Sequence, residues 1–356
     1  MKEWRHLRLV AATSLLCAAS IAVGCDGDKP PSSSNSTSTS TSTSSSGGGG
    51  GGSGGGGGSA GSGGSSSGAS LQAALSDMIP FDATPDTTGD NVYAVGLDVD
   101  GNAVINQGKL DGSVPSKALW TGSPLVSPLN IAVGTDGKTL YVTDPGAEDP
   151  SGNPGRIFNI PAAGGAIAIV TKADGYRARG IEIMSENNVD MIYFAGTNAT
   201  GEAGVFKVPA DDSGPVVEIA KGGELRDPSG IVVSKEGIVY TCDTVQDADG
   251  LGSLVAIKGG VATTIATGVR AGFPCGVALR DDDSALYVSG FDPVKRTDAV
   301  IIVDLATNKL SYFADGIDTF VESAGLHRAK LGGNTFAWAD TTNGNGLGTV
   351  FRVTLP

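Results

Sequence analysis

The sequence predicts an all-β fold: a six-bladed β-propeller with four antiparallel strands per blade. A short motif recurs six times at intervals of about 48 residues, and each copy divides into several short strand patterns. Repeats of this length with several strands each are typical of propellers. The repeats extend over residues 70–356, and a stretch of this length suits one ring with a sizeable core.

Each copy of the motif has an aromatic residue, two small or β-prone residues, and then Gly or Asp. The leading aromatics are Tyr93, Tyr141, Tyr193, Tyr240, Tyr287 and, in a looser copy, Phe336. The closing residues alternate in type: Gly96, Asp144, Gly196, Asp243, Gly290 and Asp340. We place the aromatic on the second strand of each blade, after an inner strand and a tight turn such as Asp136-Gly137.

Four of the inner strands begin near a proline. The starting positions are Pro80, Pro128, Pro228 and Pro274, with Ala178 and Ser323 in the other two copies. Third strands follow the motif, as in 156–160 and 299–303, and fourth strands follow polar turns. The sixth copy has only three strands, so we expect Leu71–Asp77 to supply its fourth strand and close the ring. A short helix is the alternative for this segment, which contains Ala and Leu.

Residues 1–24 have the layout of a signal peptide, because basic residues precede an apolar run that is short for a membrane span. Ala22-Val23-Gly24 before Cys25 resembles a bacterial lipobox, and the resemblance implies cleavage before Cys25 and its lipidation. An ordinary secretory signal with an incidental Cys is the alternative. Residues 25–69 are mostly Ser, Thr and Gly, which have little to bury, so we predict a disordered tether.

Without residues 1–24 the chain has 21 Lys and Arg against 37 Asp and Glu, a formal charge of −16. Such an acidic protein repels nucleic acid, so we expect no nucleic-acid partner. The expected partners are a membrane, through the lipid anchor, and an unknown small-molecule or protein ligand. We expect a monomer in the cell envelope that faces the periplasm or the cell exterior.

The stretch from Pro128 to Asp144 (PLNIAVGTDGKTLYVTD) resembles six-bladed propellers of the gluconolactonase/regucalcin and NHL-repeat type, and looser copies extend from Pro80 to Pro356. The resemblance implies a propeller fold, and for the enzymes of this group one divalent metal at the channel mouth, held by Glu, Asn or Asp on the turns entering the inner strands. The residues of this chain that follow the proline position are Phe81, Leu129, Arg179, Ser229, Cys275 and Ala324. None is a carboxylate or carboxamide; Asp82 and Asn130 lie one place later. This pattern counts against metal-dependent lactone hydrolysis.

Three sets of residues are candidates for a site on the face where the second strands end. Asp144, Asp243 and Asp340 lie on alternate blades and could bind a divalent cation such as calcium or a basic ligand; alternatively, each caps its own loop. His327 aligns with Glu182 on the opposite blade and could act as a base or be structural. Arg179 could contact an anionic ligand or form a salt bridge to a neighbouring loop.

Two cysteines, Cys242 and Cys275, remain in the predicted propeller, at the same face of adjacent blades. In an oxidising compartment we expect a disulfide between them, with two buried thiols or a reactive thiol as alternatives.

We therefore interpret the chain as a lipid-anchored propeller of the cell envelope that binds a ligand or a protein and needs no cofactor. The alternative is a lactonase-like hydrolase with a rearranged metal site at the three Asp residues.

Overall fold

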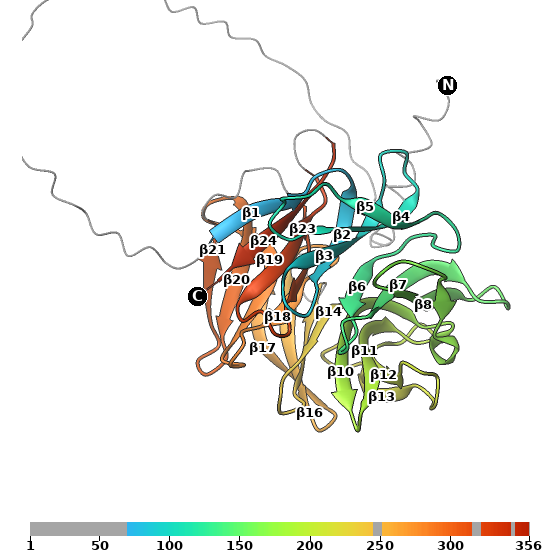
Figure 1. Cartoon of the computed structure of the whole chain (residues 1–356). Coiled ribbons are helices and arrows are strands. Elements are labelled where there is room, and N and C mark those ends of the chain that lie inside the picture. Colours follow the sequence, from blue (N-terminus) through green and yellow to red (C-terminus); the bar gives the residue numbers. More distant parts are fainter. Residues whose placement is uncertain (1–69, 245–250, 315–321, 343–345, 356) are drawn as a thin grey trace, which may run out of the picture. The chain divides into compact units, whose positions relative to one another are not determined.

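A computed structural model describes residues 70–244, 251–314, 322–342 and 346–355. These residues form six four-stranded antiparallel sheets, the blades of one propeller (Figure 1), so the predicted fold class is confirmed. Cys25, the signal-like segment and the predicted tether lie outside the described residues. No helix in the described part of the chain has both the length and the apolar character needed to cross a membrane.

In blades 1 to 5 the strands follow one another from the centre of the ring outwards in chain order, and in blade 6 the outermost strand is β1. The inner strands are β2 (Ile79–Pro85), β6 (Asn130–Val133), β10 (Arg177–Glu186), β14 (Pro228–Val233), β18 (Val277–Leu279) and β22 (Ser323–Arg328). The second strands are β3 (Asn91–Leu97), β7 (Thr139–Glu148), β11 (Val189–Thr197), β15 (Val239–Asp243), β19 (Ala285–Asp292) and β23 (Thr335–Asp340).

The two outer positions of each blade are filled in the same way. The third strands are β4 (Ala103–Lys109), β8 (Pro154–Pro161), β12 (Ala203–Pro209), β16 (Gly252–Lys258), β20 (Thr297–Asp304) and β24 (Thr349–Thr354). The fourth strands are β5 (Lys117–Thr121), β9 (Ala168–Ile169), β13 (Val217–Lys221), β17 (Val261–Val269), β21 (Lys309–Phe313) and, for blade 6, β1 (Ser70–Leu75). A 3-10 turn, η2 (Thr171–Ala173), follows the short strand β9.

The ring closes where the predicted closing segment joins blade 6. β1 pairs antiparallel with β24, from Ser70 opposite Thr354 to Leu75 opposite Val350, and Figure 1 shows the blue strand lying against the red one. Leu75 is buried against blade 1, which anchors the end of this strand. The prediction of a closing strand is therefore confirmed, and the alternative of a short helix is wrong. Inner strands of neighbouring blades are in contact all round, including β22 with β2.

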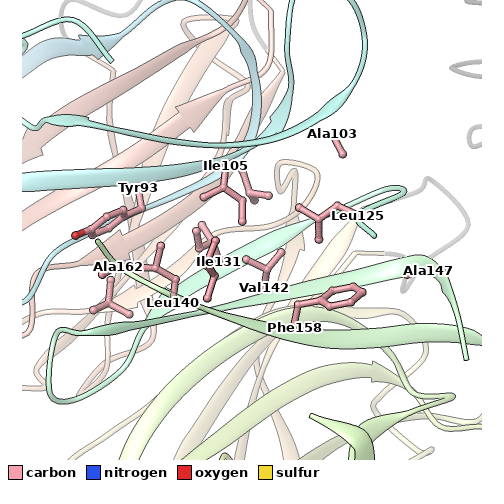
Figure 2. Close-up of a cluster of buried hydrophobic side chains, with 13 residues drawn as sticks. Tyr93, Ala103, Ile105, Leu125, Ile131, Leu140, Val142, Ala147, Phe158 and Ala162 are labelled. Carbon is pink, nitrogen blue, oxygen red and sulfur yellow. The ribbon is translucent and has the colours of Figure 1, made fainter. Parts of the chain in front are cut away.

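The hydrophobic core consists of six clusters, one between each pair of neighbouring blades. Figure 2 shows the cluster between blades 1 and 2, where Tyr93 and Ile105 face Ile131, Leu140 and Val142. Because each sheet is covered on both faces, its second and third strands are apolar along most of their length.

The repeated tyrosines explain the period of the sequence. Each one is buried against the blade that follows it, from Tyr93 against blade 2 to Tyr287 against blade 6. The sixth copy differs from the predicted alignment. Ala337, three residues before Asp340, takes the tyrosine position, whereas Phe336 packs edge-on against Tyr287 of the preceding blade with ring centroids 5.0 Å apart.

Candidate functional site

Glycines let the inner strands approach one another closely near the axis of the ring. A Cβ atom on Gly180 would lie 2.0 Å from the carbonyl oxygen of Ser229, and one on Gly276 would lie 2.0 Å from the amide nitrogen of Leu326. No real side chain tolerates such distances, so the contact requires glycine. The equivalent positions of blades 1 and 2 carry Asp82 and Asn130, both buried.

Asp82 links three blades at this level. Its side chain is 0% exposed, and its Oδ2 accepts a hydrogen bond from the Ile131 amide of blade 2 (2.8 Å) and lies 2.9 Å from Nε2 of His327 in blade 6. Its Oδ1 has no hydrogen-bond partner within the described chain. A Cβ on Gly325 would lie 1.6 Å from this oxygen, so a glycine at 325 makes room for the carboxylate.

His327 is buried on the last inner strand, beside this carboxylate. Burial disfavours the imidazolium, but the Asp82 carboxylate next to it, with a smaller contribution from Glu182, outweighs burial and raises the pKa of His327. The alignment of His327 with Glu182 is correct, because each pairs with the residue three places before the end of its motif. The two therefore lie at the same level of the ring.

A cavity of about 210 Å³ opens at the axis, beyond the ring of glycines. It is lined by the inner strands of blades 3 to 6 and by the turns that join them to the second strands. Its apolar wall includes Met184, Val232, Val277 and Leu279. This cavity opens at the face opposite to the one where the second strands end, which is the face on which we placed the candidate site from the sequence; that placement stays a prediction.

Lys330 extends across this cavity from blade 6 to blade 3. Its amine lies 3.2 Å from Oε1 of Glu182 and donates a hydrogen bond to the carbonyl oxygen of Ile183. Glu182 also accepts the amide of Ile183 at 2.9 Å, and the Lys330 side chain remains 29% exposed. This charged pair thus lines the cavity together with His327 and the apolar side chains.

The rim of the cavity carries further charges on the turns of blades 4 to 6. The amine of Lys235 donates to the carbonyl oxygen of Asp281, and Arg328 pairs with the Asp281 carboxylate at 2.9 Å. The Asp283 carboxylate accepts the backbone amide of Lys235 at 2.7 Å. These contacts hold the turns of blades 4, 5 and 6 together around the opening.

The three predicted aspartates do not come together. Asp144 accepts backbone amides of Val126, Ser127, Gly146 and Ala147, at distances of 2.7 to 3.2 Å. Asp243 accepts the amides of residues 226 and 227, and Asp340 accepts that of residue 342. All three are buried and stabilise loops of their own blades, as the alternative interpretation expected. Among the described residues no group of three His, Cys, Asp or Glu side chains could hold a metal ion.

The alternation between Gly and Asp follows from how the chain enters each inner strand. In blades 1 and 3 the entering backbone crosses so closely that a Cβ on Gly96 or Gly196 would lie 2.0 or 2.1 Å from a carbonyl oxygen. In blades 2 and 4 the entering loop turns its amides towards the Asp carboxylate instead. The alternation is therefore a packing feature of the fold.

Arg179 is engaged with a neighbouring loop. Its guanidinium forms a salt bridge with Asp227 of blade 4 and lies 5.0 Å from the ring centroid of Phe273. This arrangement matches the alternative prediction of a salt bridge and places Arg179 outside the cavity lining.

Cys242 and Cys275 are neighbours on adjacent blades and are fully buried. In this structure both are free thiols, and burial, with the nearby Cys242, raises the pKa of Cys275 well above its usual range. The positions are as predicted from the repeat; the disulfide itself stays a prediction.

Sequence reasoning missed a buried pair of acids at blades 5 and 6. Burial, and next the Asp340 carboxylate, raise the pKa of Asp298 to about 8, and burial raises that of Asp340 to about 7. One oxygen of Asp298, Oδ2, has no hydrogen-bond partner within the described chain. The repeat could have pointed to Asp298. At the equivalent position blades 1 and 3 carry Ala103 and Ala203, whereas blade 5 carries this acid.

No protein-family model and no curated protein matches the chain. Solved structures do match. A mutant α-L-arabinofuranosidase from Fusarium graminearum matches with a TM-score of 0.54 and 11% identity over 81% of this chain and 98% of that one. Virginiamycin B lyase from Staphylococcus aureus gives 0.51 and 15% over 81% and 100%. An auxiliary nutrient binding protein from Bacteroides thetaiotaomicron gives 0.51 and 11% over 80% and 75%. Identities this low show the fold alone, and the three roles differ.

The acid pair predicts a pH-dependent effect of Asp298→Asn. Because the folded protein raises the pKa of Asp298 above the unfolded value, the carboxyl's contribution to stability is fully present below about pH 4 and is lost as the pH rises through about 8. Asn mimics the protonated acid, so the variant should melt higher than the parent at pH 8.5, by on the order of 5 °C, and the gap should shrink towards pH 4. Thermal unfolding from pH 4 to 9 measures the difference in melting temperature between the variant and the parent.

The exposed Asp136→Asn variant controls for the change in net charge. A difference in melting temperature that does not vary with pH would contradict the raised pKa of Asp298.

Proposed function

We propose that this protein is an exported, lipid-anchored propeller that binds a small ligand in the cavity at the axis of the ring. The observation that carries the proposal is the cavity itself. It combines apolar side chains from blades 3 to 5 with charged groups from blades 3 to 6. Ligand sites typically have this composition, with a few placed polar groups that fix orientation.

The rigidity of the walls supports binding. Val232, Val277 and Leu279 are themselves buried members of the hydrophobic cluster between blades 4 and 5. Glu182 and His327 are held by Lys330 and Asp82. Such a site is formed before the ligand arrives, which reduces the entropy lost on binding.

The N-terminal residues support export and anchoring. The basic and apolar pattern of 1–24, the small residues before Cys25 and the Ser/Thr/Gly-rich 25–69 follow the order of a lipoprotein signal, a lipid site and a tether. A flexible tether of about 40 residues would give the propeller a reach of roughly 35 Å from the membrane.

The lactonase-like alternative receives no support from the geometry. Its metal site would need Asp144, Asp243 and Asp340, and the carboxylates of these residues are occupied by backbone amides of separate blades. We therefore carry forward the binding function alone.

Filling the cavity should abolish binding without unfolding the protein. Met184 lines the cavity and is only partly buried, so Met184→Trp should occupy the space, whereas Met184→Leu keeps a similar volume. We expect at least one class in a library of small organic acids, amines, amino acids and sugars to raise the melting temperature of the parent and of Met184→Leu, but not of Met184→Trp. No shift with any compound, or equal shifts in Met184→Trp, would overturn the proposed cavity.

The anchor is tested separately with Cys25→Ser. Lipidation requires the thiol of Cys25, so we expect the parent expressed in a bacterial host to partition into the detergent phase and the membrane fraction, and the variant to lose both. Intact mass should show the added acyl chains only in the parent. Cys242→Ser keeps the N-terminal signal and serves as the matched control. Membrane association of Cys25→Ser at the level of the parent would contradict the anchor.

A further inference from the structure

We propose that the ligand of the cavity is a small carboxylate with a short apolar body. The inference rests on the proposed binding function and names the chemical class that the cavity accepts. Three properties of the cavity support it: the charged side chains of the lining, the unused hydrogen-bond donors of the two lysine amines, and the size of the cavity.

Cationic side chains outnumber acidic ones in the lining of the cavity, although the protein as a whole is acidic. The whole chain has a formal charge of −14, yet the cavity is lined by Lys235, Arg328 and Lys330 against only Glu182 and Asp283. His327 lies among these groups, and the carboxylate that faces it, Asp82, lies behind it at the axis. Arg328 is paired with the Asp281 carboxylate beside the cavity, so Lys235 and Lys330 are the cationic groups of the lining that can attract an anion.

The cationic groups also keep unused hydrogen-bond donors. An ammonium group has three donors. The amine of Lys330 contacts Glu182 and the Ile183 carbonyl, which leaves one donor; that of Lys235 donates to a neutral carbonyl, that of Asp281, which leaves two. Among the described residues no ion pair is formed by Lys235. An incoming carboxylate can therefore accept from both amines and supply the counter-charge that Lys235 lacks.

Each acidic side chain of the cavity already has one carboxylate oxygen engaged. The Asp283 carboxylate accepts the backbone amide of Lys235, and Oε1 of Glu182 accepts both Lys330 and the Ile183 amide. A cationic ligand would have to compete with these contacts and with the three cations of the lining. The arrangement thus favours an anion over an amine.

The size and the apolar wall define the rest of the ligand. A cavity of about 210 Å³ is smaller than the roughly 300–1,000 Å³ typical of drug-sized ligands, so it suits a ligand with few non-hydrogen atoms. A carboxylate accounts for three of them, so the body is a short chain that lies against Val232, Val277 and Leu279. Pentanoate has this size, and pentanamide and pentylamine are matched probes without the negative charge.

The test compares these three probes by ligand-observed NMR titration of the full chain. We expect pentanoate to bind at least tenfold more tightly than pentanamide or pentylamine. Lys330→Gln and Lys235→Gln should each weaken pentanoate binding about tenfold. Lys309→Gln, which removes the same charge from an exposed position on strand β21, should leave it unchanged. Glu182→Gln removes the anion that competes for Lys330 and should strengthen pentanoate binding several-fold, a gain that a merely structural role of this residue would not produce.

Each outcome decides the inference. Tighter binding of pentylamine, or equal binding of pentanamide, overturns the carboxylate assignment while leaving a ligand cavity in place. Absence of binding by all three probes also overturns it, and the library experiment with Met184→Trp then decides separately whether the cavity binds other compounds. If one Lys variant fails to fold, the other variant and Glu182→Gln still decide the result.

Discussion

The buried carboxylate of Asp82 is the interaction on which the centre of this propeller depends. A charge that is 0% exposed is costly unless it is paired and hydrogen-bonded. Oδ2 of Asp82 meets this condition with contacts to both neighbouring blades, through the Ile131 amide and the His327 ring, whereas Oδ1 has no partner within the described chain. Because β1 from the start of the described chain completes blade 6, the His327 contact lies at the interface where the ring closes. The buried carboxylate in turn requires glycine at position 325, since a Cβ there would collide with it.

This arrangement decides where a ligand can bind. Close contacts between inner strands at Gly180, Gly230 and Gly276, together with the Asp82 side chain, fill the axis near the start of the inner strands. The space that remains lies at the other end, where Lys330 spans from blade 6 to blade 3. His327 belongs to both regions: it is paired with Asp82 on one side and lines the cavity on the other. The stability of the closure and the charge of the cavity are therefore linked through one residue.

The repeat allowed the fold to be predicted because its tyrosines mark a packing position that recurs in five blades. It also placed Cys242 beside Cys275 and put Asp243 and Asp340 at the ends of their second strands, whereas β7 continues past Asp144 to Glu148. The cavity could not be found in this way. Lys330 lies 147 residues from its Ile183 partner and occupies a turn whose side chain direction the repeat does not specify. Whether an Asp at a strand end faces a ligand or its own loop depends on amide directions, which a sequence pattern does not encode.

The central claim is tested most directly by a double-mutant cycle between Asp82→Asn and His327→Gln, measured by urea unfolding as a function of pH. The raised pKa of His327 means that the pair's contribution to stability is fully present below about pH 6.5 and is lost as the pH rises through the pKa of the folded protein. The account predicts a coupling free energy of roughly 1.5–3 kcal/mol at pH 6 that decreases towards pH 9. Additive effects of the two substitutions at pH 6, or a coupling that does not change with pH, would contradict it.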